Sequence, residues 1–268
     1  MAETLPTIAI LGAGSMGGAI LSGLQRHGAN VRVTTRSAAS AAGIPGAVST
    51  ELDPQANITA VAGARVVLIA VKPLMVGDVL REIAPALADD AIVVSLAAGV
   101  TTATMEAIVA SSVVRSMPNT PSLVGRGVTG ISAGSRSTDA DVALVQTLFE
   151  TVGDVLVVPE SQLDALSTIS GSGPAYVFFL IEQLTRTAID LGFSEHEAAT
   201  MVQGTFRGAS ELLAASESRP DELRRKVTSP KGTTERAIAV LEEANLSELF
   251  TVAAKAALAR AKELAAGA

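Results

Sequence analysis

The stretch Thr7-Ile8-Ala9-Ile10-Leu11-Gly12-Ala13-Gly14-Ser15-Met16-Gly17 decides the fold of the first half of this chain. A short apolar run enters a G-x-G-x-x-G turn, and a helical pattern follows. Short β-branched runs then alternate with helical patterns, which predicts a parallel sheet covered by helices. The expected strands are 7–11, 31–34, 66–71, 92–96, 113–115, 130–132 and 155–158, and the expected helices are 15–27, 74–87, 101–110 and 139–151.

The pattern changes near residue 160, after which only helical periodicity is found. The predicted fold class is therefore α/β, with a Rossmann-type doubly wound parallel sheet over 1–160 and an all-α domain over 161–268. The helix expected over 174–191 carries an unbroken apolar run, Tyr176–Ile181. Such a helix must be buried in this subunit or against a second one, and we favour a subunit interface. The helices expected in this half are 161–170, 174–191, 194–215, 220–227, 233–244 and 247–266.

Composition excludes several classes of protein. Hydrophobic residues make up 48% of the chain but aromatic residues only 3%, so the core must consist of aliphatic side chains. A net charge of −7 argues against a nucleic-acid partner, which needs a basic surface. The chain has no long apolar run, no signal-peptide pattern and no cysteine, and it has only two histidines. We therefore expect a cytoplasmic protein without a membrane span, a disulfide or a metal site.

The glycine turn has the spacing of a dinucleotide site. Gly12 permits the tight turn, Gly14 lets the backbone approach a pyrophosphate, and Gly17 lets helix and strand pack closely. The start of the following helix supplies free N–H groups for the phosphates. The alternative is a glycine turn that serves packing alone. The residues predicted to bind the coenzyme here are Gly12, Ala13, Gly14, Ser15, Met16 and Gly17.

The end of the second strand selects the coenzyme. NAD sites usually place an acid there, which accepts hydrogen bonds from the ribose 2′-hydroxyl. This chain has Thr34-Thr35-Arg36-Ser37, with no acid in reach. Arg36 and Ser37 are suited to a 2′-phosphate, so NADPH is favoured, with NADH possible. The alternative is that Arg36 is a solvated loop residue.

Three more segments end strands at the same edge of the predicted sheet, where ligands of such folds bind. Small residues after the 92–96 strand leave space for the nicotinamide half, and the Asn119 amide could orient it. Lys72 could bind phosphate or ribose oxygens, or it could cap a helix. The coenzyme residues predicted in these segments are Ala70, Val71, Lys72, Pro73, Ala97, Ala98, Gly99 and Asn119.

A second glycine-containing turn opens a helix in the second half. It reads Val227-Thr228-Ser229-Pro230-Lys231-Gly232-Thr233-Thr234. Its hydroxyl groups and the free N–H groups at a helix start are suited to a small anionic substrate. The two turns together predict one active site of a reductase, built from both ends of the chain.

These motifs make the chain resemble the pyrroline-5-carboxylate reductase family. The most specific are Ser170-Gly171-Ser172-Gly173-Pro174-Ala175-Tyr176 and Val227–Thr234, and all the motifs follow the family's order. The resemblance implies reduction of the C=N bond of 1-pyrroline-5-carboxylate to L-proline by NAD(P)H. It also implies a helical domain that forms a homodimer or a larger ring, such as a decamer.

The resemblance also implies roles for single residues. The substrate site is expected at Val227, Thr228, Ser229, Pro230, Gly232, Thr233 and Thr234, with the substrate carboxylate on the backbone N–H groups of this helix start. The Thr234 hydroxyl is expected to reach the ring nitrogen, with Glu217 near it, and Ser170–Gly173 to close over the nicotinamide. The alternatives are a helix-start hydroxyl without a substrate role for Thr234 and a solvated carboxylate for Glu217.

The chain departs from the family pattern at Lys231, where the family usually has glycine. A positive φ there would add roughly 1 kcal/mol of strain, whereas a negative φ would make the change harmless. Three other functions stay open: reduction of another cyclic imine, β-hydroxyacid dehydrogenation, and NADP-dependent regulation without catalysis. The second is disfavoured because the catalytic lysine of that class would fall on Val177.

Overall fold

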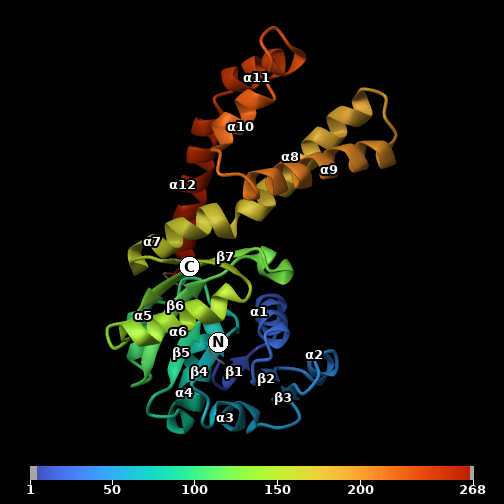
Figure 1. The fold of residues 1–268 in the computed structure, drawn as a ribbon. Helices are drawn as coiled ribbons and strands as arrows, with labels where there is room; N and C mark the ends of the chain where they lie inside the picture. Colours follow the sequence, from blue (N-terminus) through green and yellow to red (C-terminus); the bar gives the residue numbers. More distant parts are fainter. Residues whose placement is uncertain (1–4, 266–268) are drawn as a thin grey trace. The chain divides into compact units, whose positions relative to one another are not determined.

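The computed structural model describes residues 5–265, and these form two compact units. The first contains the chain up to Pro174 together with the segment that begins at Ala257, and the second is Ala175–Ala256. The domain boundary predicted at residue 160 stays a prediction. Figure 1 shows the order of the elements along the chain.

Eight strands of the described residues form one sheet in the order β3-β2-β1-β4-β5-β6-β7-β8. This order places the first strand in the middle, with the chain winding outward on both sides, as expected for a Rossmann-type fold. The strands are β1 (Ile8–Leu11), β2 (Val31–Thr35), β3 (Val48–Ser49), β4 (Val66–Ile69), β5 (Ile92–Ser95), β6 (Ser112–Met117), β7 (Gly127–Ala133) and β8 (Gly153–Val157).

The predicted doubly wound sheet is confirmed, with two differences. The sheet is not fully parallel, because β7 pairs with β6 in antiparallel fashion and β8 then runs parallel to β7. The short 3₁₀ connection η3 (Thr120–Val124) between β6 and β7 leaves no room for the crossover that a parallel pair requires. The two-residue strand β3, which pairs with β2, is not expected from the sequence.

Two layers of helices cover the sheet because successive strand residues point to opposite faces. Ile8 and Ile10 belong to one buried cluster, together with Ile20 of α1 and Phe149 of α6. Ala9 and Leu11, the alternate residues of the same strand, belong to the other cluster, which α3, α4 and α5 cover. These helices are α1 (Ser15–Arg26), α2 (Ala38–Ala42), α3 (Ala56–Val61), α4 (Val76–Ile83), α5 (Thr102–Glu106) and α6 (Asp139–Glu150).

Some helices of this unit differ from the expectation. The 74–87 helix is split into 3₁₀ turns η1 (Pro73–Met75) and η2 (Ala84–Ala86) around α4, and the 101–110 helix is shortened to α5. Pro85 explains the C-terminal split, because proline cannot donate a hydrogen bond within a helix. Helices α2 and α3 lie in a segment where the sequence predicts no element.

The chain from residue 160 to residue 265 contains no strand, as predicted. Ser194 caps α9 through the expected capping box with Glu197. No helix of residues 5–265 is long and apolar enough to cross a lipid bilayer. The elements are α7 (Glu160–Leu166), a π-helical turn η4 (Ser167–Gly171), α8 (Gly173–Asp190), α9 (Glu195–Ala214), α10 (Pro220–Lys226), α11 (Thr233–Glu243) and α12 (Leu246–Ala265).

Candidate active site

The glycine turn between β1 and α1 has three glycines in three different environments. Gly12 has φ 94°, and a Cβ there would lie 2.9 Å from the Ala70 carbonyl oxygen. A Cβ on Gly17 would lie 2.4 Å from the Gly12 carbonyl oxygen, whereas a Cβ on Gly14 would meet no protein atom within 4 Å. A side chain at the first or the last glycine would therefore clash with the backbone, whereas the middle glycine has free space beside it.

The open position lies at the start of α1. Gly14 is the N-cap of this helix, no side chain caps its N–H groups, and its first turn contains no acid. A helix start of this kind is suited to a phosphate group. The chemistry of the turn therefore fits the pyrophosphate of a dinucleotide.

Beside this turn lies a cleft of about 730 Å³ at the carboxyl ends of the central strands. It gathers residues that follow β1, β2 and β4, which are separate in the sequence. Those from the predicted coenzyme set are Gly12, Arg36, Ala70, Val71 and Lys72. The exposed Lys72 precedes η1, so the structure leaves both of its expected roles open.

The cleft also contains residues that the sequence analysis does not single out. Asn57 in α3 is buried; its Oδ1 accepts from Thr34 Oγ1 at 2.7 Å and its Nδ2 donates to Glu82 Oε2 at 3.2 Å. Thr50, which follows β3, lines the cleft as well. No local motif marks these residues, because α3 and β3 bring them to the cleft only through tertiary packing.

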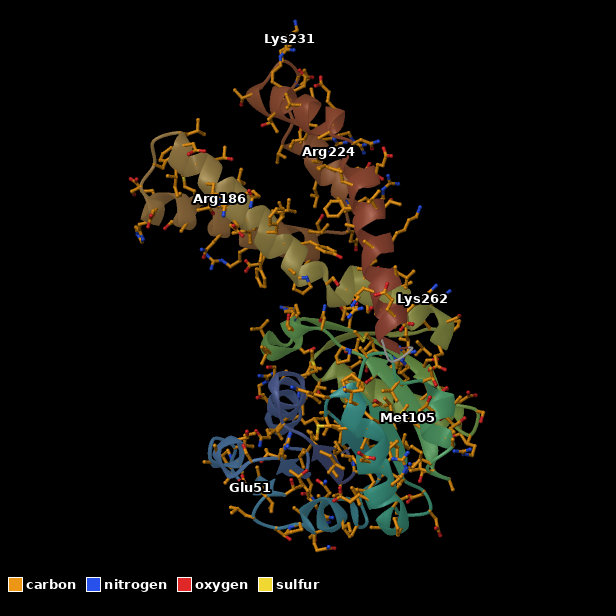
Figure 2. The ribbon with its side chains drawn as sticks, turned by 180° about the vertical axis from the view of Figure 1, so that it is seen from behind. Glu51, Met105, Arg186, Arg224, Lys231 and Lys262 are labelled. Atoms are coloured by element: carbon orange, nitrogen blue, oxygen red, sulfur yellow. The ribbon has the colours of Figure 1, made fainter. Side chains whose placement is uncertain are left out.

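The expectation that no acid reaches the end of β2 is wrong. Ala38 N donates a hydrogen bond to Glu51 Oε2 at 3.1 Å, so this carboxylate lies directly beside the Arg36-Ser37 turn. Figure 2 labels Glu51 in this part of the molecule. The unpredicted pairing of β3 with β2 is the reason, since it carries the residues after Ser49 to the end of β2.

The loops after β5 and β6 continue the same edge of the sheet. Ala97 N donates to Ser95 Oγ at 3.1 Å, and Gly99 adopts a positive φ of 76°. Asn119 is buried after β6; its Nδ2 donates to Ser170 O at 2.9 Å and its Oδ1 accepts from Val128 N at 2.8 Å. One N–H of this amide is therefore used to hold the Ser170–Gly173 segment.

The start of that segment belongs to the π-helical turn η4 (Ser167–Gly171). Ser172 N donates to Ser167 O at 2.9 Å, which is the five-residue spacing of a π-helix, a feature frequent at functional sites. Arg115 of β6 is 4% exposed and pairs with two acids of α7, Asp164 at 2.5 Å and Glu160 at 3.4 Å. These contacts fix α7 and the turn that follows it against β6.

The Val227–Thr234 turn joins α10 to α11. Thr228 Oγ1 donates to Arg224 O at 2.7 Å, and Gly232, the N-cap of α11, donates its N–H to Ser229 O at 3.0 Å. No side chain caps α11 at this N-cap. A Cβ on Gly232 would lie 2.9 Å from the Ser229 carbonyl oxygen, so glycine is needed there.

Lys231 in this turn has φ 60°, the left-handed conformation. Of the two alternatives open from the sequence, the structure therefore has the strained one. Figure 2 shows the Lys231 side chain at the outer end of the turn. Its backbone N–H donates to Glu235 Oε2 at 2.9 Å, so an acid that the sequence analysis does not identify occupies part of this helix start.

Thr234 and Glu217 are exposed and lie in different elements of the helical unit. Thr234 is in the first turn of α11, and its hydroxyl forms no hydrogen bond with residues 5–265. Glu217 lies in the connection between α9 and α10. Both side chains are thus exposed, and no hydrogen bond joins them.

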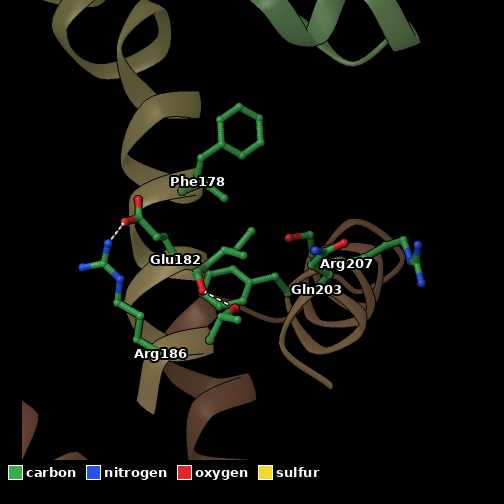
Figure 3. Close-up of a pocket in the computed structure, with 10 residues that line it drawn as sticks. Phe178, Glu182, Arg186, Gln203 and Arg207 are labelled. Carbon is green, nitrogen blue, oxygen red and sulfur yellow. Dashed lines mark hydrogen bonds and ion pairs between the residues drawn. The ribbon is translucent and has the colours of Figure 1, made fainter. Parts of the chain in front are cut away.

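The helical unit has few buried residues of its own, namely Ala188, Ala198 and Val202. The apolar run of α8 is exposed, including Phe178 at 66% and Phe179 at 58%. A groove of about 720 Å³ lies between α8 and α9, with an ion pair of Glu182 and Arg186 at its edge (Figure 3). The apolar run therefore does not form a buried core helix within this unit.

Two family models match different parts of this chain. A family model described as "Pyrroline-5-carboxylate reductase dimerisation" matches residues 160–264, and one described as "NADP oxidoreductase coenzyme F420-dependent" matches residues 7–99. The chain is 38% identical to the pyrroline-5-carboxylate reductase of Pseudomonas aeruginosa, over 97% of each chain.

Solved structures give the same result. The pyrroline-5-carboxylate reductase of Coxiella burnetii is similar with a TM-score of 0.90 and 38% identity, over 97% of this chain and 99% of that one. The pyrroline carboxylate reductase of Plasmodium falciparum, solved with NADP bound, has a TM-score of 0.82 and 26% identity, over 97% and 98% of the two chains.

Proposed function

The chain belongs to the pyrroline-5-carboxylate reductase family, and we propose that it reduces the C=N bond of 1-pyrroline-5-carboxylate to give L-proline at the expense of NAD(P)H. The observation that carries this proposal is the cleft at the carboxyl ends of β1, β2 and β4, where Gly12, Arg36 and Lys72 meet beside an open helix start. The protein is an oxidoreductase that acts on a small molecule.

The first unit would hold the coenzyme. The N–H groups at the start of α1 would bind the pyrophosphate, and Arg36 with Ser37 would bind the 2′-phosphate of NADPH. Asn119 and Ala97–Gly99 would line the nicotinamide half, while Asn119 also holds the Ser170–Gly173 segment through Ser170 O. When bound, the reduced nicotinamide supplies the hydride that the imine carbon takes up.

The second unit would hold the substrate. The backbone N–H groups at the start of α11 would bind its carboxylate, and the Thr234 hydroxyl would orient the ring nitrogen, with Glu217 near it. A free cyclic imine protonates near neutral pH, so the iminium carbon is already electrophilic and no strong general acid is needed. The added hydrogen at carbon and the proton on nitrogen together give the CH–NH bond of the product.

The exposed apolar face of α8 supports a homo-oligomer, as does the match to a dimerisation family. A second copy of this chain would cover Val177–Leu180 and the groove between α8 and α9. A larger ring, such as a decamer, and the cytoplasmic location expected from the sequence stay predictions.

The reaction is tested by mixing the protein with NADPH and pyrroline-5-carboxylate and following the absorbance of the reduced coenzyme. We expect oxidation of NADPH with this imine, and less with its six-membered homologue. Thr234→Ala should lower kcat/KM by about 10- to 100-fold, the loss of one hydrogen bond to a charged substrate, while the Kd for NADPH is unchanged. Thr147→Ala, on the exposed face of α6, is the matched control and should behave as wild type.

Two outcomes would contradict the proposal. A protein that leaves NADPH unoxidised with the imine, yet reduces NADP⁺ with a hydroxyacid, belongs to another enzyme class. A Thr234→Ala variant with wild-type kcat/KM would remove this hydroxyl from the reaction.

The oligomer is tested by Phe178→Arg, which places a charge on the apolar face of α8. Burying an unpaired charge is costly, so we expect the variant to shift toward the monomer in size-exclusion chromatography with light scattering. Leu52→Arg is the control, because Leu52 is 75% exposed in the first unit. A Phe178→Arg variant of unchanged mass would argue against this face as the interface.

A further inference from the structure

The turn after β2 carries both a cation and an acid. Arg36 follows β2 and lines the coenzyme cleft. Thr50, the residue before Glu51, lines the same cleft. The carboxylate of Glu51 accepts the Ala38 N–H at 3.1 Å, two residues beyond Arg36. Opposite charges therefore stand at the place in the fold where NAD and NADP are distinguished.

Backbone contacts hold Glu51 at this turn. Its N–H donates to Arg36 O at 3.1 Å and lies 3.2 Å from Ser49 Oγ. Ser49 Oγ donates to the same Arg36 carbonyl at 3.1 Å, and Ser49 is paired with Thr35 in the parallel β2–β3 ladder. The backbone of Glu51 is thus positioned by the pairing of β3 with β2 and by its contacts with Arg36 and Ser49.

We propose that Glu51 is a coenzyme-specificity residue that lets this protein use NADH as well as NADPH. The inference rests on the assignment of the cleft to the coenzyme. A carboxylate at this turn can accept hydrogen bonds from the ribose 2′-hydroxyl of NADH and repels the 2′-phosphate of NADPH. Arg36 acts in the opposite sense, because a guanidinium binds phosphate oxygens in bidentate fashion.

Arg36 and Glu51 do not form an ion pair with each other in the coenzyme-free protein. Among residues 5–265, no carboxylate lies within ion-pair distance of the Arg36 guanidinium. Arg36 and Glu51 are both exposed, so each is available to a ligand. NADPH would engage mainly Arg36, and NADH would engage mainly Glu51.

A purely structural role for Glu51 is separable from this one. If Glu51 only fixes the Ala38 turn, glutamine should replace it, since its amide oxygen can accept the same N–H. If the charge discriminates between coenzymes, Glu51→Gln should change their relative affinities while leaving the fold intact.

The experiment titrates wild type and Glu51→Gln with NADPH and with NADH, following the fluorescence of the reduced nicotinamide. Removal of the Glu51 charge, which repels the 2′-phosphate through partly screening solvent, should lower the Kd for NADPH about five- to tenfold. Loss of the anionic acceptor for the ribose 2′-hydroxyl should raise the Kd for NADH about two- to fivefold. The control is Glu150→Gln in α6, which packs on β6, β7 and β8 at the opposite end of the sheet. A ratio of the two Kd values that changes less than about twofold on Glu51→Gln overturns the inference.

A second variant, Arg36→Gln, separates this inference from the assignment of the cleft. This variant should raise the Kd for NADPH more than the Kd for NADH. If Arg36→Gln shifts the ratio toward NADH and Glu51→Gln leaves it unchanged, the inference about Glu51 is wrong and the cleft assignment stands. If neither coenzyme binds the wild-type protein, the proposed function fails, and this inference fails with it.

Discussion

The three glycines of the β1–α1 turn allow fold and coenzyme binding to be tested separately. Gly17→Ala adds a Cβ at 2.4 Å from the Gly12 carbonyl oxygen, well inside the closest distance that real Cβ atoms show. Helix α1 would have to move away from β1 by roughly half an ångström or more, and overpacking of this kind costs about 1–3 kcal/mol. The unfolding free energy of the coenzyme-free protein should fall by that amount.

Gly14→Ala should behave in the opposite way. Gly14 has φ −73°, which alanine adopts freely, and its new Cβ would meet no protein atom within 4 Å. The unfolding free energy should therefore change by no more than about 0.5 kcal/mol. The added methyl group would instead occupy the space that the pyrophosphate needs, and we expect about a 10- to 100-fold rise in the Kd for NADPH.

Gly18→Ala is the matched control. Gly18 also has open space at its Cβ position, but it lies inside α1, one turn beyond Gly14. Alanine should stabilise the helix by up to about 1 kcal/mol without changing the Kd for NADPH. Urea unfolding and NADPH fluorescence titration measure both quantities. The reasoning is refuted if Gly14→Ala destabilises the coenzyme-free protein as much as Gly17→Ala does, or if it binds NADPH like wild type.

Two further variants test the structure away from the coenzyme. Lys231→Gly should raise the unfolding free energy by about 0.5–1 kcal/mol, because relief of the left-handed strain exceeds the entropy that glycine adds to the unfolded chain; a less stable variant in urea unfolding, at fixed protein concentration, would contradict the strained turn. Burial opposes ionisation of Asp141, but its contacts with Arg65 and Thr138 prevail and lower the pKa of this carboxyl below its ordinary value. The stability that Asp141 contributes is thus present above the pKa of the unfolded chain and is lost as pH falls through the folded pKa. Asp141→Asn should cost about 1–3 kcal/mol at pH 7 and progressively less as pH falls below about 4, the ordinary pKa of an aspartate, and a cost in urea unfolding that does not fall with pH would rule this pairing out.

The coenzyme turn could be predicted from the sequence because its determinants are local. A buried strand, three glycines and a helix follow one another within residues 7–27, and the backbone demands of Gly12 and Gly17 depend on neighbours that such a unit always supplies. The helices of residues 160–265 could be predicted for the same reason, since periodicity and the cap at Ser194 mark them along the chain.

The sequence by itself thus determined the Rossmann-type unit, the helical unit and the strand ends that form the cleft. Only the tertiary structure decided which distant side chains complete that cleft, because they depend on pairing between segments. Strand β3 has two residues and no pattern of its own, yet its register against β2 brings Glu51 to Arg36. The antiparallel direction of β7, the bond from Asn119 to Ser170 and the positive φ of Lys231 likewise depend on packing and loop closure, which no local periodicity records.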